Sequence, residues 1–427
     1  MERSVLPAKL MPGAFVGTRI GTCVKWLRGD ARPLSSKDLS QAISFARITL
    51  VVGLVFLHYG SYPNSKVTPF HGLDVNEHQL ATAINSFVLF CFFSVVPLLS
   101  LMSGWLFFGF DEKNAASALF ERARRRFTSL YLPLVFWNAL FFAILFALYR
   151  FLPEHALLRE INIDFATAAR RQYVNAIFGI TSQPVGFQFW FVRDLFVTAL
   201  FSPLLWIAMK RAPLAGVVVL GACWIADFAL PIFFRPDVPF FFFLGGLVRT
   251  RGVPLEIGRE ATKILGITYL VLMLLRTLAP YVFDGVGETA EELLLVATRA
   301  ARLIGALACW GLFQRVALTE VGARVARFGS LAFFLHAVHY PFLEQAKIVL
   351  WSFLPAETDV WMLFHYLTSV VVTVAFGVGS GFLLARWWPA AFALMNGGRD
   401  PAAARPSDRD RPVAPKLSPR LTDRAPA

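Results

Sequence analysis

Runs of about twenty apolar residues, separated by short charged segments, set the architecture of this chain. A helix of that length crosses the hydrocarbon core of a bilayer, which is about 30 Å thick. Only 16% of the residues are charged, whereas about a quarter are charged in an average soluble domain. The sequence therefore predicts an all-α, polytopic bundle of transmembrane helices surrounded by membrane lipids.

About ten such spans are predicted. The loops between them alternate strictly between basic and non-basic, and the positive-inside rule places the basic loops in the cytoplasm. An even number of spans then puts both termini in the cytoplasm. The predicted spans cover residues 42–59, 87–108, 130–152, 187–209, 214–233, 239–248, 264–282, 293–313, 328–350 and 361–387.

Three segments of different composition are predicted. Residues 1–41 are basic and polar, without the apolar core of a signal peptide, and form a cytoplasmic N-terminal segment. Residues 42–390 form the transmembrane domain. Residues 391–427 are rich in Pro, Ala, Arg and Asp and are predicted to be a disordered cytoplasmic tail. The net charge of +13 follows from the basic loops, so no nucleic-acid partner is expected.

Arg47 and His58 bracket ten uncharged residues in the first span. Eleven helical positions bring the two side chains to within about 20° of one face, about 16 Å apart along the axis. One interpretation is that both residues simply flank the membrane. The other is a functional face, on which Arg47 binds the phosphates of a nucleotide-like donor and the reacting group reaches His58.

Charged residues also interrupt other spans. Arg193 and Asp194 lie within the run FWFVRDLFV, where a lone charge costs a few kcal/mol, so each needs a partner or a wet cavity. A structural clamp and a substrate contact both fit them. His336 and His339 share one helix face, but no third ligand is evident, and four scattered cysteines form no metal motif, so no metal is expected.

Two further motifs lie at the end of the second apolar run and just before the third. Ser103 and Gly104, at the end of the second run, allow close helix approach, as a packing notch or as part of a site. Arg125 and Arg126 lie in the basic cluster before the third run, where they could bind phosphates or anchor the helix at anionic lipid headgroups.

Together these residues resemble the acyltransferase-3 family of integral membrane acyltransferases. The resemblance extends over residues 45–388, and each motif is in the expected order. The chain departs from the family at Trp105, where a Phe is usual, and in lacking the fused SGNH-type domain of some members. The matching motifs are Arg47 with His58, Ser103-Gly104-Trp105, Arg125-Arg126 with Tyr131 and Pro133, Phe189-Trp190-Phe191, and residues 330–341 with His339.

The resemblance implies transfer of an acyl group, usually acetyl, from cytoplasmic acyl-CoA to a hydroxyl of an extracytoplasmic polysaccharide or lipid-linked glycan, in a bacterial inner membrane. His58 is then the expected catalytic residue, as general base or as acyl acceptor. The expected CoA-binding residues are Arg47, Arg125 and Arg126. The expected substrate-binding residues are Ser103, Trp190, Arg193, Asp194 and His339.

Two other classes of protein are compatible with intramembrane charges. A transporter or flippase for a polar or lipid-linked substrate is one, although the chain has no internal repeat of the kind common in transporters. A glycan polymerase or ligase is the other, although the predicted outer loops are short.

Overall fold

The structure is a computed structural model, and it describes residues 21–63, 65–159, 161–228, 230–283, 288–353 and 358–399. Over those residues the chain is helical, with no β-strand, as the sequence predicts. Residues 1–20 of the predicted N-terminal segment and residues 400–427 of the predicted tail lie outside the described residues.

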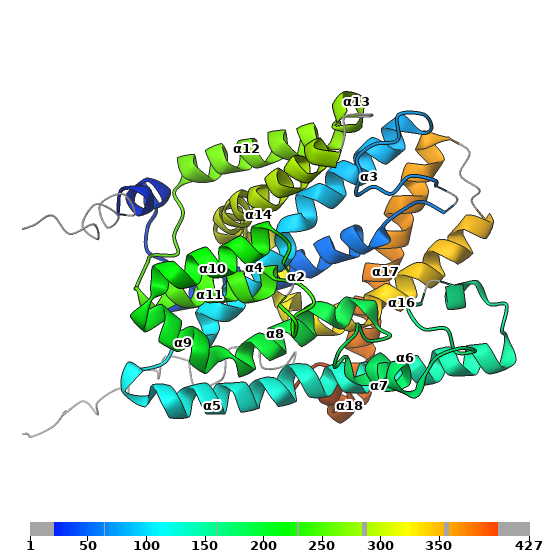
Figure 1. The fold of residues 1–427 in the computed structure, drawn as a ribbon, viewed down its shortest axis with the longest axis horizontal. Coiled ribbons are helices and arrows are strands. Elements are labelled where there is room, and N and C mark those ends of the chain that lie inside the picture. Colours follow the sequence, from blue (N-terminus) through cyan, green and yellow to red (C-terminus); the bar gives the residue numbers. More distant parts are fainter. Residues whose placement is uncertain are drawn as a thin grey trace, which may run out of the picture.

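Helix α2 lies in the middle of the bundle, the long α5–α6 segment runs along one side, and α17 crosses the direction of α5–α6 at a steep angle (Figure 1). Their bounds are α2 Ser36–Tyr59, α3 Gln79–Cys91, α4 Val95–Phe107, α5 Ala115–Arg126, α6 Leu132–Phe151, α7 Arg170–Phe178, α8 Trp190–Leu200, α9 Ser202–Arg211, α10 Pro213–Ile225, α11 Asp237–Thr250, α12 Arg259–Thr277, α13 Pro280–Phe283, α14 Glu288–Val316, α15 Glu320–Ala326, α16 Ala332–Phe353, α17 Asp359–Trp387 and α18 Pro389–Met395.

Each predicted apolar run coincides with a helix, but the count of ten spans is not confirmed. Within the described residues, six helices are long and apolar enough to cross a membrane. A seventh candidate is the pair Phe187–Leu200 and Ser202–Arg211, which is bent by 61°. Pro203 follows the bend, and its missing N–H and bulky ring prevent the helix from continuing straight.

Helix α2 owes its central position to a nearly continuous apolar surface. The Oγ atom of Ser35 accepts a hydrogen bond from the amide of Asp38 and caps the first turn. Gly60 ends the helix with a φ of 62°, which a glycine adopts without strain. Between these ends α2 packs against α4, α14, α16 and α17, so a side chain on α2 can face the centre of the bundle.

Two glycines let α4 and α11 pack backbone to backbone. A Cβ on Gly104 would lie 2.0 Å from the carbonyl oxygen of Phe242, and one on Gly245 would lie 2.0 Å from that of Leu101. Gly104 is therefore a packing notch, which is one of the two interpretations that the sequence left open.

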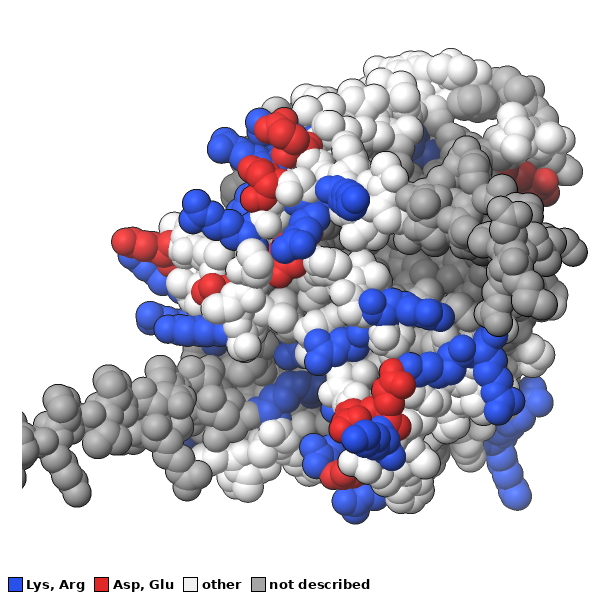
Figure 2. Space-filling view, turned by 90° about the vertical axis from the view of Figure 1, so that its left-hand side faces the viewer, with Lys and Arg blue, Asp and Glu red and all other residues white. Residues whose placement is uncertain are grey.

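Basic side chains gather at one end of the bundle. Figure 2 shows this end, where Lys and Arg cover more of the surface than Asp and Glu. Helix α9 ends on this side of the bundle (Figure 1) and carries Lys210 and Arg211 in its last turn. This is the pattern expected of a cytoplasmic surface. The sidedness of the two termini stays a prediction.

The first residues of the predicted disordered tail are ordered in the structure. Residues 391–395 belong to α18, and residues 396–399 form a turn that packs on the bundle. The sequence pattern missed this because the segment is short and followed by Pro- and Arg-rich sequence.

Candidate active site

The C-terminal turn of α2 places His58 against His339 of α16. The Nδ1 atom of His58 lies 2.7 Å from the Nε2 atom of His339, and the two ring planes are within 7° of parallel. Phe187 and Tyr340 pack edge-on against the His58 ring. The His339 side chain is fully buried, so the pair is held inside the protein.

Hydrogen bonding assigns the protons of this pair in the neutral state. The Nδ1 atom of His339 lies 2.7 Å from the carbonyl oxygen of His336, which can only accept, so this Nδ1 carries the hydrogen. The Nε2 atom of His339 must then accept from Nδ1–H of His58. The Nε2 atom of His58 is left with a lone pair, and no described residue donates to it. His58 is therefore prepared to take a proton.

A cavity of about 740 Å³ lies next to His58. The last turns of α2 and the loop that follows it line the cavity, which therefore lies at the C-terminal end of α2, whereas Arg47 lies near the middle of that helix. Its wall mixes aromatic and charged side chains. The aromatic residues include Phe70, Trp190, Trp224, Tyr340 and Trp351, and the charged residues are Asp227, Arg235, Asp237, Arg276, Arg299, Arg302, Glu344 and Lys347.

Most of these charges are arranged in pairs. Arg299 lies 2.7 Å from Asp227, and Lys347 lies 3.3 Å from Glu344. Arg235 differs, because its guanidinium stacks over the ring of Trp190 at 5.1 Å and has no carboxylate within ion-pair distance among the described residues. Trp190, predicted to contact substrate, is thus in the cavity wall.

A second polar cluster lies beside the middle of α2, about three turns before His58. Arg126 donates from Nη2 to the Oγ atom of Ser103 at 3.2 Å, so the structure brings two predicted motifs together. Arg126 is also close enough to Arg47 for the two guanidinium groups to repel each other. Arg47 is exposed and makes neither a hydrogen bond nor an ion pair with any described residue.

Arg125 does not join this cluster. Its side chain is 72% exposed and forms an ion pair with Glu121, one turn earlier on α5. Consecutive helical residues point about 100° apart, so only one of the two arginines can face Ser103. Arg126 therefore remains a candidate for the donor site, whereas the position of Arg125 gives no support for its predicted role in CoA binding.

Arg193 and Asp194 form a buried clamp away from the cavity. They pair with each other at 2.9 Å, and both side chains are almost completely buried. The Arg193 guanidinium donates to the carbonyl oxygens of Gly179, Ile180 and Ile232. The Asp194 carboxylate accepts from the amides of Phe234 and Arg235 at 2.9 Å. The pair thus hydrogen-bonds α8 to two loops, at residues 179–180 and 232–235, which supports the structural interpretation.

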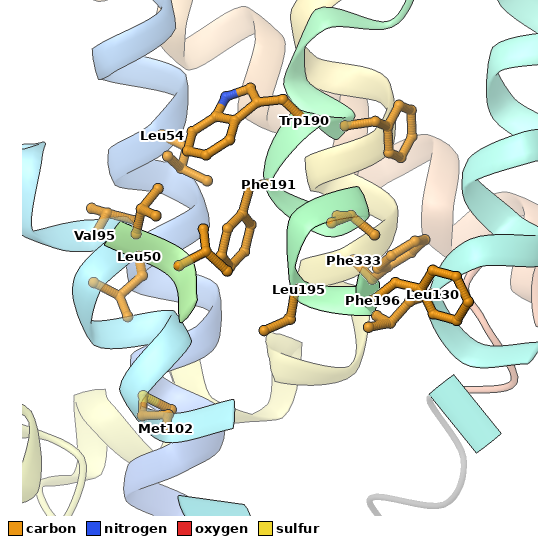
Figure 3. Close-up of a cluster of buried hydrophobic side chains, with 14 of the residues drawn as sticks. Leu50, Leu54, Val95, Met102, Leu130, Trp190, Phe191, Leu195, Phe196 and Phe333 are labelled. Carbon is orange, nitrogen blue, oxygen red and sulfur yellow. The ribbon is translucent and has the colours of Figure 1, made fainter. Parts of the chain in front are cut away.

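An apolar layer along α2 separates Arg47 from His58. Leu50 and Leu54 lie between Arg47 and His58 on one side of the helix and are 3% and 2% exposed. Figure 3 shows them facing Trp190 and Phe191 of α8, within the main buried cluster. Buried apolar side chains therefore lie along α2 between the cavity next to His58 and Arg47.

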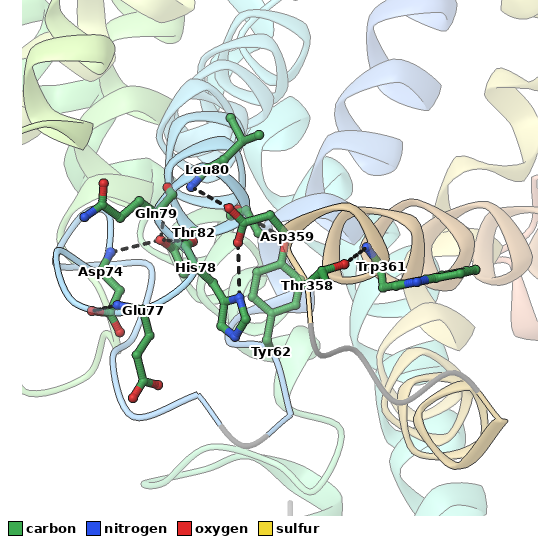
Figure 4. A network of polar contacts seen from close by, with 11 residues as sticks. Tyr62, Asp74, Glu77, His78, Gln79, Leu80, Thr82, Thr358, Asp359 and Trp361 are labelled. Carbon is green, nitrogen blue, oxygen red and sulfur yellow. Dashed lines mark hydrogen bonds and ion pairs between the residues drawn. The ribbon is translucent and has the colours of Figure 1, made fainter.

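Further polar contacts fix the loop at the cavity end. His78 and the amide of Leu80 both contact the carboxylate of Asp359, which begins α17 (Figure 4). Burial, and then the charge of Asp359, raise the pKa of Tyr62 in the same loop.

Helices α2 and α17 are joined by a hydrogen bond at this end of the bundle. The hydroxyl of Tyr59 donates to Nδ1 of His365, because Nε2 of His365 faces the carbonyl oxygen of Lys347 and therefore carries the hydrogen. Sequence reasoning missed His365, although a single histidine within an apolar run was a usable signal.

A comparison with known families identifies the chain. A family model for an acyltransferase domain, of the acyltransferase-3 type, matches residues 40–387. The chain belongs to the acyltransferase-3 family. The predicted resemblance and the predicted enzyme class are thus confirmed: this is an acyltransferase, and its apolar helices make it a multi-pass membrane protein. The family match favours catalysis over the transport and polymerisation alternatives.

One curated relative covers most of this acyltransferase. The succinoglycan biosynthesis protein ExoH of Rhizobium meliloti (strain 1021) is 25% identical over 371 residues, which are 85% of this chain and 93% of that protein. No solved structure matches the chain. The described part of the chain contains no group of three or more His, Cys, Asp or Glu side chains that could hold a metal ion.

Proposed function

We propose that this acyltransferase moves an acyl group, most simply acetyl, from cytoplasmic acyl-CoA to a hydroxyl of an extracytoplasmic polysaccharide or lipid-linked glycan, in a bacterial inner membrane. One observation carries the proposal. A single helix, α2, presents Arg47 near its middle and, three turns later at its C-terminal end, a histidine whose lone pair is available next to a large cavity.

The donor would bind on the Arg47 side of the apolar layer. CoA carries phosphate and diphosphate groups, and arginine binds such groups through paired, charge-assisted hydrogen bonds. Arg47 and Arg126 have no carboxylate within ion-pair distance among the described residues, so both charges are available to a ligand. The basic surface at this end favours the cytoplasm, where acyl-CoA is present.

The acceptor would bind in the cavity. A volume of about 740 Å³ lies within the range of sites for small ligands. Its aromatic rings offer apolar contact area, and its charged side chains can hydrogen-bond to hydroxyl groups. The name of the relative associates it with succinoglycan, which supports an exported polysaccharide as the acceptor class.

The proposed chemistry uses the His58–His339 pair. As the acceptor oxygen attacks the thioester carbonyl, its proton moves to Nε2 of His58, the C–S bond breaks, and the CoA thiolate leaves. The imidazolium so formed keeps its Nδ1–H bond to Nε2 of His339, which stabilises the positive charge. The thiolate takes up a proton from solvent, and His58 releases its proton to solvent, which restores the neutral pair. In a second route His58 accepts the acyl group itself and passes it to the acceptor.

Mass spectrometry of exported glycans tests the proposal. Glycans are compared between cells that carry the wild-type protein, His58→Ala, or no protein. We expect one glycan to lose the same acyl mass in the variant and in the cells without protein, which identifies the acceptor and the acyl group together. Glycans of unchanged acyl content, differing only in amount or length, would rule the proposal out.

A further inference from the structure

The turn that follows α18 lies outside the matched acyltransferase domain, yet it is fixed to the bundle. The side chain of Asn396 is fully buried and donates to the carbonyl oxygens of Ser330 and Arg399. The indole of Trp137 donates to the carbonyl oxygen of Met395 at 2.9 Å. These contacts tie the turn to α6 and to the segment that precedes α16.

An irregular stretch of helix receives this turn. Residues Phe127–Tyr131, directly after Arg126, form a π-helical turn, which leaves backbone carbonyl groups without their usual partners. The carbonyl oxygen of Ser129, in this π-helical turn, accepts a hydrogen bond from Nη1 of Arg399 at 3.2 Å. Gly397 has a φ of +65°, and a Cβ at this position would lie 2.3 Å from the same carbonyl oxygen. Only glycine permits this approach.

Arg399 is thereby held next to the two arginines of the proposed donor site. Its guanidinium lies over the ring of Phe333 at 4.8 Å, so its direction is fixed. Arg47 and Arg126 are the charged groups that act on it. No Asp or Glu side chain of the described residues forms an ion pair with any of these three arginines.

Such a cluster is unfavourable without an anion. Burial, and then the charges of Arg47 and Arg126, lower the pKa of Arg399 to about 9. Because a guanidinium stays protonated at neutral pH, this shift expresses desolvation and repulsion that a bound anion would relieve.

We propose that Arg399 completes a phosphate-binding site with Arg47 and Arg126, and that the C-terminal turn is therefore part of the donor site. The inference rests on the proposed function, since the phosphate or diphosphate group would be that of acyl-CoA. It adds a residue from beyond the matched domain and explains why a turn of four residues is packed so tightly.

Binding of radiolabelled CoA to the purified full-length protein in detergent tests this inference. CoA is the part shared by all acyl-CoA donors, so the test does not depend on the acyl group. We expect Arg399→Gln to weaken CoA binding by about 10-fold or more, as loss of a charged hydrogen bond does. Arg399→Lys keeps the charge and should weaken it less. Gly397→Ala displaces the turn and should resemble Arg399→Gln.

Arg386→Gln is the matched control. Arg386 is exposed in the last turn of α17, where it forms no ion pair with a described residue, and its loss should leave CoA binding unchanged. Pantetheine, which has no phosphate, serves as competitor. If Arg399 binds phosphate, the Arg399→Gln variant should bind pantetheine, as measured by competition, as tightly as the wild type does. An equal loss for pantetheine and CoA would show general damage and overturn the inference.

The remaining outcomes separate this inference from the proposed function. If Arg399→Gln binds CoA as tightly as the wild type, the inference about Arg399 is wrong, but the proposed function is not affected. If that variant also loses co-purified anionic phospholipid, as detected by mass spectrometry, the phosphate belongs to a lipid headgroup and the donor assignment of Arg399 is wrong. A wild-type protein that binds no CoA contradicts the proposed donor as well.

Discussion

Nδ1 of His58 and Nε2 of His339, from residues 281 positions apart in the chain, lie 2.7 Å apart and share one hydrogen. Because the carbonyl oxygen of His336 fixes the hydrogen on the far side of His339, the pair has one neutral arrangement. The residue that faces the cavity and the residue that sets its tautomer come from different helices. Activity should therefore depend on the packing of α2 against α16 as well as on His58.

Replacement of either histidine should separate their roles. His58→Ala removes the proton acceptor, and we expect acyl transfer to fall by about 10²- to 10⁴-fold. His339→Ala leaves Nδ1–H of His58 without its acceptor, and we expect a smaller loss of about 10- to 100-fold. Acyl transfer is measured in isolated membranes with labelled acyl-CoA. His71→Ala, at an exposed loop position, is the control. Equal losses in both variants would argue against a supporting role for His339.

The neighbouring arginines Arg125 and Arg126 offer a matched comparison. Arg126 faces Ser103 and the proposed donor site, whereas Arg125 is exposed and paired with Glu121. We expect Arg126→Gln to raise KM for acyl-CoA by about 10-fold with little change in kcat, because it removes binding common to the ground and transition states. Arg125→Gln should behave like the wild type. A higher KM in Arg125→Gln alone would reverse this assignment.

The Arg193–Asp194 clamp predicts a loss of stability. Asp194→Asn leaves the buried guanidinium of Arg193 without its counter-charge, which costs about 3–5 kcal/mol of the free energy of unfolding. The thermal midpoint of the detergent-solubilised protein, followed by size-exclusion chromatography, measures the effect. Asp227→Asn breaks a partly exposed pair with Arg299 and should cost at most about 1 kcal/mol. Normal stability with a raised KM for acceptor in Asp194→Asn would instead favour substrate contact.

Two glycines should respond to alanine in opposite directions. Gly104→Ala places a Cβ 2.0 Å from the carbonyl oxygen of Phe242, so α4 and α11 must separate. We expect it to destabilise the protein by about 1–3 kcal/mol or more. Gly266, in α12, has no atom within 4 Å of an added Cβ, and Gly266→Ala should stabilise the helix by about 0.5–1 kcal/mol. Thermal midpoints of the two variants compare them directly, and a tolerated Gly104→Ala would disprove close packing at this position.

Periodicity and residue type predicted much of this arrangement. Apolar runs located the helices, and the spacing of Arg47 and His58 placed both on one side of α2. Residue type alone could not show which of Arg125 and Arg126 faces inward, because that depends on how α5 is rotated against α4. It also could not pair His58 with His339, since the contact arises from tertiary packing over a long separation in the chain.

Arg399 shows a different limit of the sequence. The composition around it is typical of a disordered tail, and only the fold reveals that the carbonyl oxygen of Ser129, in a π-helical turn, accepts a hydrogen bond from Arg399. The bend after α8 had a local signal in Pro203, but its consequence for span counting needed the coordinates.

The apolar layer formed by Leu50, Leu54 and Phe191 has a consequence for the energy balance of the cell. A membrane potential stores about 2.3 kcal/mol per elementary charge for each 100 mV. A continuous column of water between Arg47 and His58 would let protons dissipate that store at every turnover. These apolar side chains lie where such a column would run, so in the proposed transfer an acyl group would pass by parting them briefly, and they would close behind it. The proposed reaction could then draw on two compartments while the membrane stays electrically sealed.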